Sequence, residues 1–89
     1  MVFYNNYSER SLLLLRYRLR ELMADYQYKT GERITFGELS QKTGIHRATL
    51  SRIANQKGYS TVTDNIDKLC DFFGCTVTDL MEHIPSKKE

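Results

Sequence analysis

The chain has 89 residues, of which 40% are hydrophobic and 27% are charged, and its formal net charge is +2. We expect one small globular domain, too short to include a separate catalytic domain. The longest apolar run, Leu12–Leu15, is far shorter than a membrane span, and the first residues lack the pattern of a secretory signal. Two cysteines do not make a disulfide framework, which favours a cytoplasmic protein with free thiols.

Charge is distributed unevenly along the chain. Residues 31–63 carry five Lys and Arg against two Glu, whereas residues 64–89 carry three basic residues against six acidic ones. A polyanion would be attracted to the middle of the chain and repelled by its last third. The net charge alone is too small to indicate nucleic-acid binding, but this distribution favours it.

An aromatic, Asn-rich arm at residues 1–7 precedes the first predicted element, which is a long helix. Asn6 or Ser8 is its expected N-cap, and Gly31 ends it. Apolar residues at spacings of three and four define the face that packs on the core. These residues are Leu12, Leu15, Leu19, Leu22 and Tyr26.

Two short helices follow in the middle of the chain. Thr35 and Glu38 form a T-x-x-E capping box at the start of the first, and Gly44 ends it in a tight turn that needs a positive φ. The second runs from about Arg47 to Asn55. Its buried positions are Leu50 and Ile53, so its other side has no core to fill.

Two further helices complete the pattern. One runs from about Asp64 to Phe73 and ends at Gly74, and the next is short, begins with a cap at Thr76 and ends at Pro85. The sequence thus predicts an all-α, five-helix domain at residues 8–85, followed by a tail at residues 86–89. The residues expected in its core are Leu19, Leu22, Leu39, Ile45, Leu50, Ile53, Ile66, Leu69 and Leu80.

The outer face of the third helix has the chemistry of a major-groove reader. An Arg donates two parallel hydrogen bonds to guanine, Asn can pair with adenine, and Ser and Ala are short enough for close approach. No acidic residue stands between Lys42 and Asn55, so nothing on this face would be repelled by phosphates.

Residues 36–56, FGELSQKTGIHRATLSRIANQ, resemble the phage-repressor helix-turn-helix family of the Xre and Cro type. The later segment DNIDKLCDFFGCTVTDLMEHIP is similar to the last two helices of short members, and the resemblance covers roughly residues 15–85. It implies a five-helix repressor-like fold whose third helix reads the major groove. The chain departs from the family pattern at His46, where Ser is usual, and in a longer link at residues 28–34.

We therefore expect a transcriptional regulator that binds double-stranded DNA, with its recognition helix at about residues 46–55. Backbone N–H groups at two helix starts, together with the loop after the recognition helix, would contact phosphates. The candidate DNA-binding residues are Thr35, His46, Arg47, Ala48, Thr49, Ser51, Arg52, Asn55, Lys57, Ser60 and Thr61.

The far side of the first predicted helix is unusually apolar for a surface helix. At about 100° per residue it carries Leu13, Tyr17, Ala24 and Tyr28. Either the aromatic arm folds back over this face, or the face meets a second copy of the chain. We expect a homodimer, because two copies on half-sites about one helical turn apart are the usual solution for a short helix-turn-helix.

Other functions fit the sequence less well. The spacing of Cys70, Cys75 and His83 suits no compact zinc site, so we expect neither a metal nor any other cofactor. Ser51 and His46 have no acidic partner nearby in sequence, so we expect no enzyme. The alternative is a protein-interaction module, an antitoxin or adaptor, that binds an unknown protein through its acidic C-terminal helices.

Overall fold

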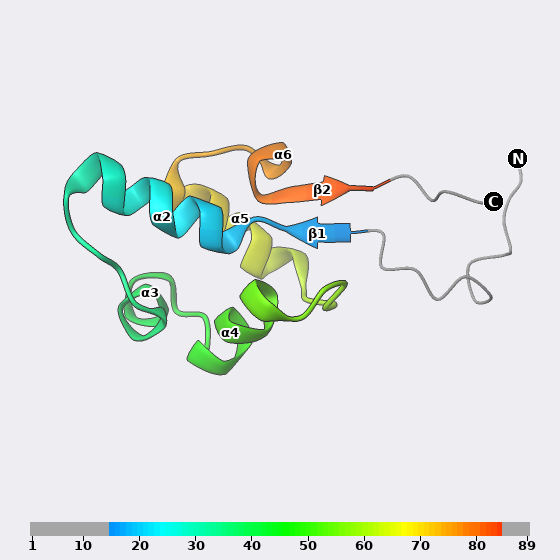
Figure 1. Ribbon diagram of the computed structural model, residues 1–89. Coiled ribbons are helices and arrows are strands. Elements are labelled where there is room, and N and C mark those ends of the chain that lie inside the picture. Colours follow the sequence, from blue (N-terminus) through cyan, green and yellow to red (C-terminus); the bar gives the residue numbers. More distant parts are fainter. Residues whose placement is uncertain (1–14, 85–89) are drawn as a thin grey trace, which may run out of the picture.

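The computed structural model describes residues 15–84, which form five helices and a two-stranded antiparallel sheet (Figure 1). The elements in chain order are β1 (Leu15–Tyr17), α2 (Leu19–Thr30), α3 (Phe36–Thr43), α4 (Arg47–Asn55), α5 (Thr63–Phe73), α6 (Val77–Leu80) and β2 (Met81–His83). The five-helix, repressor-like prediction is confirmed, and the small sheet is an addition to it. The predicted arm, the tail and Leu13 lie outside the described residues. No described helix combines the length and the hydrophobicity that a membrane span requires.

One apolar core joins all five helices. Every predicted core residue is buried except Leu22, which is half-buried and packs against the others. The core also includes Ile34, which the sequence analysis did not single out and which lies in the link between α2 and α3. Burial of this residue explains how the long link is held against the body of the domain.

An aromatic cluster fastens the second half of α2 to α5. The Tyr26 ring lies 5.4 Å from Phe72 and 6.2 Å from Phe73, measured between ring centroids. The two phenylalanine rings meet edge to face at 5.0 Å, a favourable arrangement for aromatic pairs. This packing accounts for three of the aromatic residues of the chain.

The first predicted helix begins later than its leucine spacing indicates. Residues Leu15–Tyr17 are strand β1, which pairs antiparallel with β2 so that Arg16 lies opposite Glu82. The helix starts only at Leu19, and the backbone N–H of Arg18 donates to the Leu80 carbonyl at 2.7 Å. The predicted continuous helix through residues 15–17 is therefore wrong.

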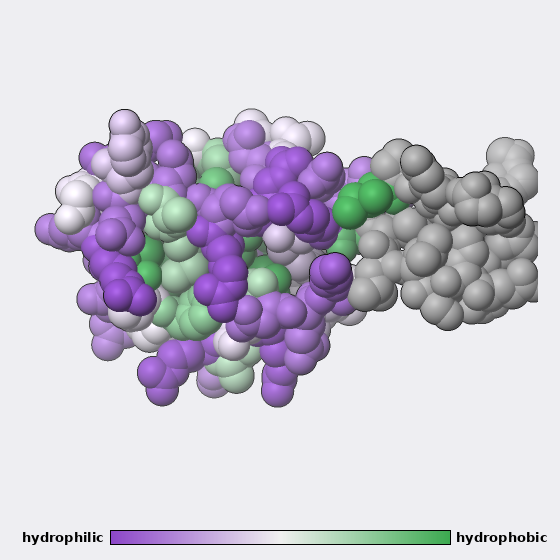
Figure 2. Space-filling model, in the orientation of Figure 1, coloured by the Kyte–Doolittle hydropathy of each residue, from purple (hydrophilic) through white to green (hydrophobic). Residues whose placement is uncertain are grey.

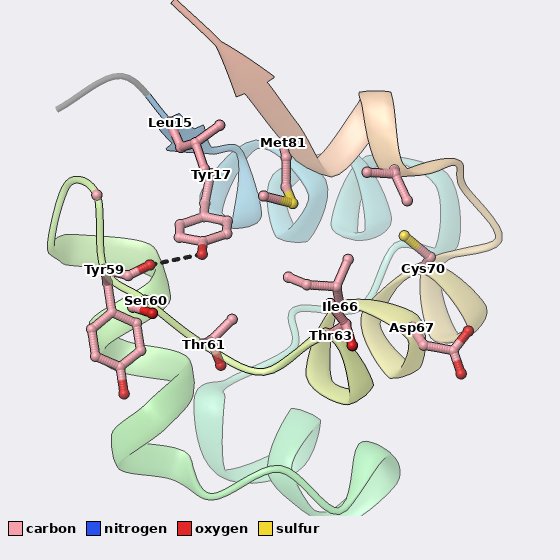
Figure 3. Close-up of a pocket in the computed structure, with 12 residues that line it drawn as sticks. Leu15, Tyr17, Tyr59, Ser60, Thr61, Thr63, Ile66, Asp67, Cys70 and Met81 are labelled. Atoms are coloured by element: carbon pink, nitrogen blue, oxygen red, sulfur yellow. Dashed lines mark hydrogen bonds between the residues drawn. The ribbon is translucent and has the colours of Figure 1, made fainter. Parts of the chain in front are cut away.

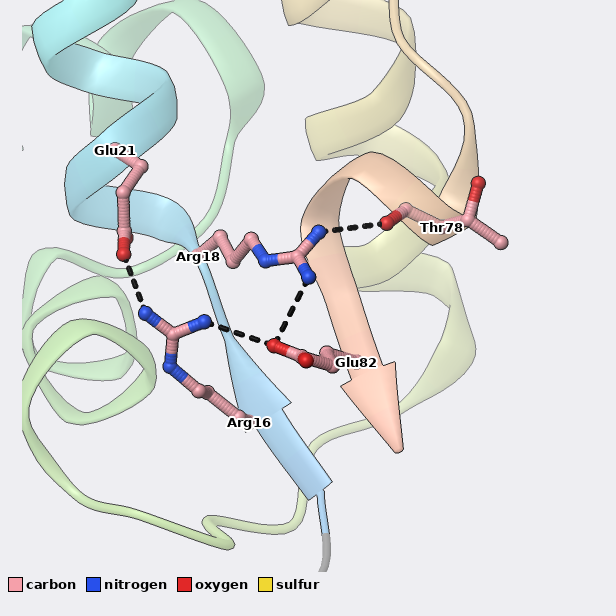
Figure 4. A network of polar contacts seen from close by, with 5 residues as sticks. All are labelled: Arg16, Arg18, Glu21, Thr78 and Glu82. Carbon is pink, nitrogen blue, oxygen red and sulfur yellow. Dashed lines mark hydrogen bonds and ion pairs between the residues drawn. The ribbon is translucent and has the colours of Figure 1, made fainter. Parts of the chain in front are cut away.

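Charge pairing across the two strands favours this outcome (Figure 4). The Glu82 carboxylate accepts from the guanidinium groups of Arg16 and Arg18, each at 2.9 Å. Arg16 also pairs with Glu21 at 2.6 Å, and Arg18 donates to the Thr78 carbonyl at 3.0 Å. Successive side chains of a strand point to opposite faces. Arg16 can therefore pair with Glu82 on one face of the ribbon, while Tyr17 lies on the other.

The last helix is shorter than expected because the residues after it pair with β1 as a strand. It was predicted to run to Pro85, but α6 ends at Leu80 and the chain continues as β2. Its start is as predicted, because Thr76 and Asp79 form a capping box. Ile84, which this helix was expected to carry, lies beyond β2 and is 39% exposed.

Candidate nucleic-acid interface

The two central helices and the turn between them form a helix-turn-helix unit. Thr35 Oγ1 accepts from the Glu38 backbone N–H at 3.1 Å, and the Glu38 carboxylate accepts from the Thr35 N–H at 2.9 Å, which closes the predicted capping box of α3. At its other end, Gly44 has a φ of 80° and donates to the Ser40 carbonyl. A left-handed residue here lets the chain reverse directly into α4.

The turn is tightened by one side chain. Thr43 Oγ1 donates to the Leu39 carbonyl at 2.7 Å and accepts from the Ile45 N–H at 3.2 Å. This second bond leads the chain from the turn to Ile45, which is 2% exposed in the core. The relative placement of α3 and α4 is thus determined by buried and hydrogen-bonded groups, as a docking surface for DNA requires.

The two sides of α4 differ as the sequence predicts. Leu50 and Ile53 are buried, whereas most of the candidate residues on the opposite side are exposed. The exposed ones are His46, Arg47, Ala48, Arg52 and Asn55. Ser51 and Thr49 are half-buried, so these two short side chains lie close to neighbouring atoms.

The start of α4 lies against the start of α3. A Cβ placed on Gly37 would lie 3.5 Å from a terminal guanidinium nitrogen of Arg47, so the Arg47 side chain passes over this glycine. His46 is the N-cap residue of α4, and its imidazole makes no capping hydrogen bond. The backbone N–H groups of this first turn therefore have no partner in the His46 side chain.

Asn55, in the last turn of α4, is the candidate with the most side-chain contacts. Its Oδ1 accepts from Arg20 Nε at 3.1 Å and from a terminal nitrogen of the same guanidinium at 2.5 Å. Its Nδ2 donates to Ser51 Oγ at 3.2 Å. Arg20 was not among the predicted site residues, because only the tertiary fold brings α2 next to the end of α4.

The loop after α4 is held from both sides. The Tyr17 hydroxyl donates to the Tyr59 carbonyl at 2.7 Å (Figure 3). The Asn65 amide donates to Thr61 Oγ1 at 2.9 Å. Lys57 and Ser60 remain exposed, while Thr61 is half-buried. The hydroxyl of Thr61 thus already serves as an acceptor within the protein, which sets it apart from the other candidate phosphate contacts.

A groove of about 630 Å³ lies behind this loop, between the two strands, α5 and α6. Figure 3 shows Tyr17, Ile66, Cys70 and Met81 around it. Burial raises the pKa of the Tyr17 phenol, and the neighbouring Tyr59 adds to this effect. Ser60 and Thr61 line the groove as well.

Hydrophilic residues cover most of the surface that Figure 2 shows. Hydrophobic residues appear there as a band in the left half of the view and as a smaller area next to the grey atoms.

Comparison with known families agrees with this geometry. The model of the Cro/C1-type helix-turn-helix DNA-binding domain matches residues 18–86, which include all five helices. Neither the curated proteins nor the solved structures give a match. Since the family model covers most of the sequence, the chain belongs to the Cro/C1-type helix-turn-helix DNA-binding domains.

Proposed function

We propose that this DNA-binding regulator recognises a specific duplex sequence by placing α4 in the major groove. The observation that carries the proposal is the exposure of Arg47, at the start of α4, and of Arg52, on the side of α4 opposite the buried Leu50. A guanidinium so placed can donate two parallel hydrogen bonds to guanine. Ala48 lies on the same outer side, where a methyl group can contact a thymine methyl.

The phosphate contacts would come from groups around α4. The proposed donors are the backbone N–H groups at the starts of α3 and α4, beside Thr35 and His46, and the exposed side chains of Lys57 and Ser60. Helix N-termini favour anions because their first N–H groups have no partner within the helix. We place Thr49 and Thr61 at the edge of this interface, since both are half-buried.

We further propose that the chain acts as a homodimer on a pseudo-palindromic site. Helix α4 has nine residues and reads few base pairs by itself, so two half-sites provide the necessary specificity. Of the face expected to meet the second copy, Ala24 and Tyr28 lie exposed on α2, whereas Tyr17 does not belong to that helix. Tyr17 belongs to β1 and uses its hydroxyl on Tyr59 within the same chain.

The test is selection of binding sites from randomised duplex DNA, followed by salt titrations with the selected duplex. Arg47→Ala and Arg52→Ala should each weaken binding by about 1–3 kcal/mol and relax the preference at one base pair. Lys57→Ala should weaken all sequences alike and reduce the salt slope by about one. Lys68→Ala on α5 is the matched charge control and should leave the slope unchanged. Unaltered sequence preference in both arginine variants would contradict the assignment of α4.

The alternative function is a protein-interaction module that uses the acidic helices α5 and α6. Asp67 and Asp71 are exposed on α5, which favours a basic partner on that side. The salt titration distinguishes the two functions, because weak and salt-independent binding to duplex DNA would support the alternative.

A further inference from the structure

Three side chains from two helices form one hydrogen-bonded chain beside the outer face of α4. Arg20 of α2 donates twice to the Asn55 carbonyl oxygen, and the Asn55 amide nitrogen donates to the Ser51 hydroxyl one turn earlier. The Arg20 guanidinium also lies 5.8 Å from the centre of the Phe36 ring, within range of a cation–π contact. Arg20 is thereby held between the start of α3 and the end of α4.

The chemistry of arginine determines which atoms donate and which accept in this series of three side chains. A guanidinium has five donors and no acceptor, so the Asn55 atom that faces Arg20 has to be its oxygen. The Asn55 nitrogen then faces Ser51 and makes the Ser51 oxygen an acceptor within the protein. A serine hydroxyl has a single proton, and in this arrangement that proton remains available for a partner outside the protein.

The same arrangement limits what Asn55 can do. A bidentate contact with adenine needs the Asn oxygen as an acceptor and its nitrogen as a donor. Two N–H groups of Arg20 already occupy the two acceptor positions of the Asn55 oxygen. Adenine could be read by Asn55 only if the contact with Arg20 were broken.

We propose that Arg20 is a positioning residue of the DNA interface, which fixes Asn55 and thereby presents the Ser51 hydroxyl as a hydrogen-bond donor to a base. The base edges that fit such a donor are acceptors, namely a purine N7, guanine O6 or thymine O4. Asn55 is then a link between α2 and the recognition helix and not itself a reader of adenine. This inference rests on the proposed function of α4.

The first experiment examines the free protein. In NMR spectra, the side-chain amide signals of Asn55 should be well dispersed in the wild type, because the group is fixed by two partners. In Arg20→Met they should move toward the values of a freely rotating amide. Lys29→Met removes the same charge from the same helix and should leave the Asn55 signals in place. Unchanged Asn55 signals in Arg20→Met would overturn the orienting role without bearing on DNA binding.

The second experiment measures competition among duplexes that differ from the selected site by one base pair. Ser51→Ala should reduce the preference at one base pair by about three- to tenfold, the effect of one hydrogen bond. Arg20→Met should reduce the preference at the same base pair, and the double variant should lose no more than either single one. Arg20→Lys, which keeps a hydrogen-bond donor, should retain part of the preference at this base pair.

Two results would overturn the proposal in the second experiment. One is that Arg20→Met lowers the affinity for every duplex equally and reduces the salt slope, which would make Arg20 a simple phosphate contact. The other is that Arg20→Met and Ser51→Ala each reduce the sequence preference, but at different base pairs. A wild-type protein without any sequence preference would instead overturn the proposed function itself, together with this inference.

Discussion

At the scale of one residue, Ile53 shows that one side of α4 packs in the core while the other is exposed. Its side chain is 2% exposed and packs with the core, while its neighbour Arg52 is exposed. Ile53→Ala should lower the free energy of unfolding by about 2–5 kcal/mol, because it removes buried methyl groups and leaves a cavity. Urea unfolding followed by circular dichroism measures this. Val62→Ala, at a position 62% exposed, is the control and should change stability by less than about 0.5 kcal/mol.

Cys75 is a residue whose chemistry is altered by its neighbours. Burial, together with the adjacent Cys70 thiol and the charge of Asp79, raises the pKa of the Cys75 thiol to about 11. Only the thiolate reacts with alkylating agents, so iodoacetamide at pH 8 should modify Cys75 far more slowly in the folded protein than in urea. Mass spectrometry of timed samples measures both rates. Equal rates in the two conditions would show that the thiol is not protected.

At the scale of an element, the start of α3 depends on one hydroxyl group. Thr35 accepts from the Glu38 N–H, which otherwise has no partner within the helix. Thr35→Ala should destabilise the protein by about 0.5–2 kcal/mol, the usual effect of losing an N-cap. The measurement is urea unfolding without DNA, so that any phosphate contact of Thr35 does not contribute. An unchanged unfolding midpoint would mean that the capping box adds nothing to the stability of α3.

Helices with local start and stop signals were the ones that the sequence predicted well. The capping boxes at Thr35 and Thr76 and the left-handed glycines at Gly44 and Gly74 act within a few residues, so their pattern is visible without the fold. The periodicity of α4 likewise separated its buried side from its exposed side. The bounds of α4 and its two sides were therefore predicted from local features.

The two strands were missed because their stabilising contacts are distant in sequence. Arg16 and Glu82 are separated by 66 positions, and no local pattern connects them. Meanwhile Leu12, Leu15 and Leu19 recur with helical spacing, and this stronger local signal gave the wrong prediction for residues 15–17. Arg20 was overlooked at the candidate site for the same reason, since its partner Asn55 is 35 positions away.

The β1–β2 ribbon should be sensitive to acid. Hydrogen bonds from Arg16 and Arg18 lower the pKa of the Glu82 carboxyl below its usual value. A lowered folded-state pKa stabilises the ribbon above the pKa of the unfolded chain, and this contribution is lost as pH falls through the folded value. The protection of β1 and β2 amides, measured as their exchange rate relative to the intrinsic rate at each pH, should therefore fall below about pH 4, near the ordinary range of Glu. In Glu82→Gln this dependence on pH should disappear, and a dependence that persists would assign it to another carboxyl group.

At the scale of the whole molecule, contacts between elements distant in sequence hold α4 and the loop that follows it in place. The Tyr17 hydroxyl ties β1 to the loop after α4, and the Asn65 amide ties the same loop to α5. Arg20 joins α2 to the end of α4. Contacts from β1, α2 and α5 therefore join α4 and the loop that carries Lys57 to the rest of the domain.

The short length of α4 leads to a prediction about how many copies of the chain bind one duplex. Because one α4 of nine residues reads few base pairs, the sites selected from randomised DNA should contain two similar half-sites related by a two-fold axis. Their centres should lie about 10 base pairs apart or a multiple of this, so that both copies of α4 meet the same side of the duplex. Sedimentation of the complex should give two chains for each duplex.

A duplex with one half-site scrambled provides the matched comparison. It should bind much more weakly at equal salt, because the second copy then makes only phosphate contacts. Insertion of five base pairs between the half-sites should have a similar effect, since it rotates one half-site to the opposite side of the helix. Equal affinity for the intact, scrambled and lengthened duplexes, with one chain bound to each, would show that a single α4 is sufficient and that the functional unit is a monomer.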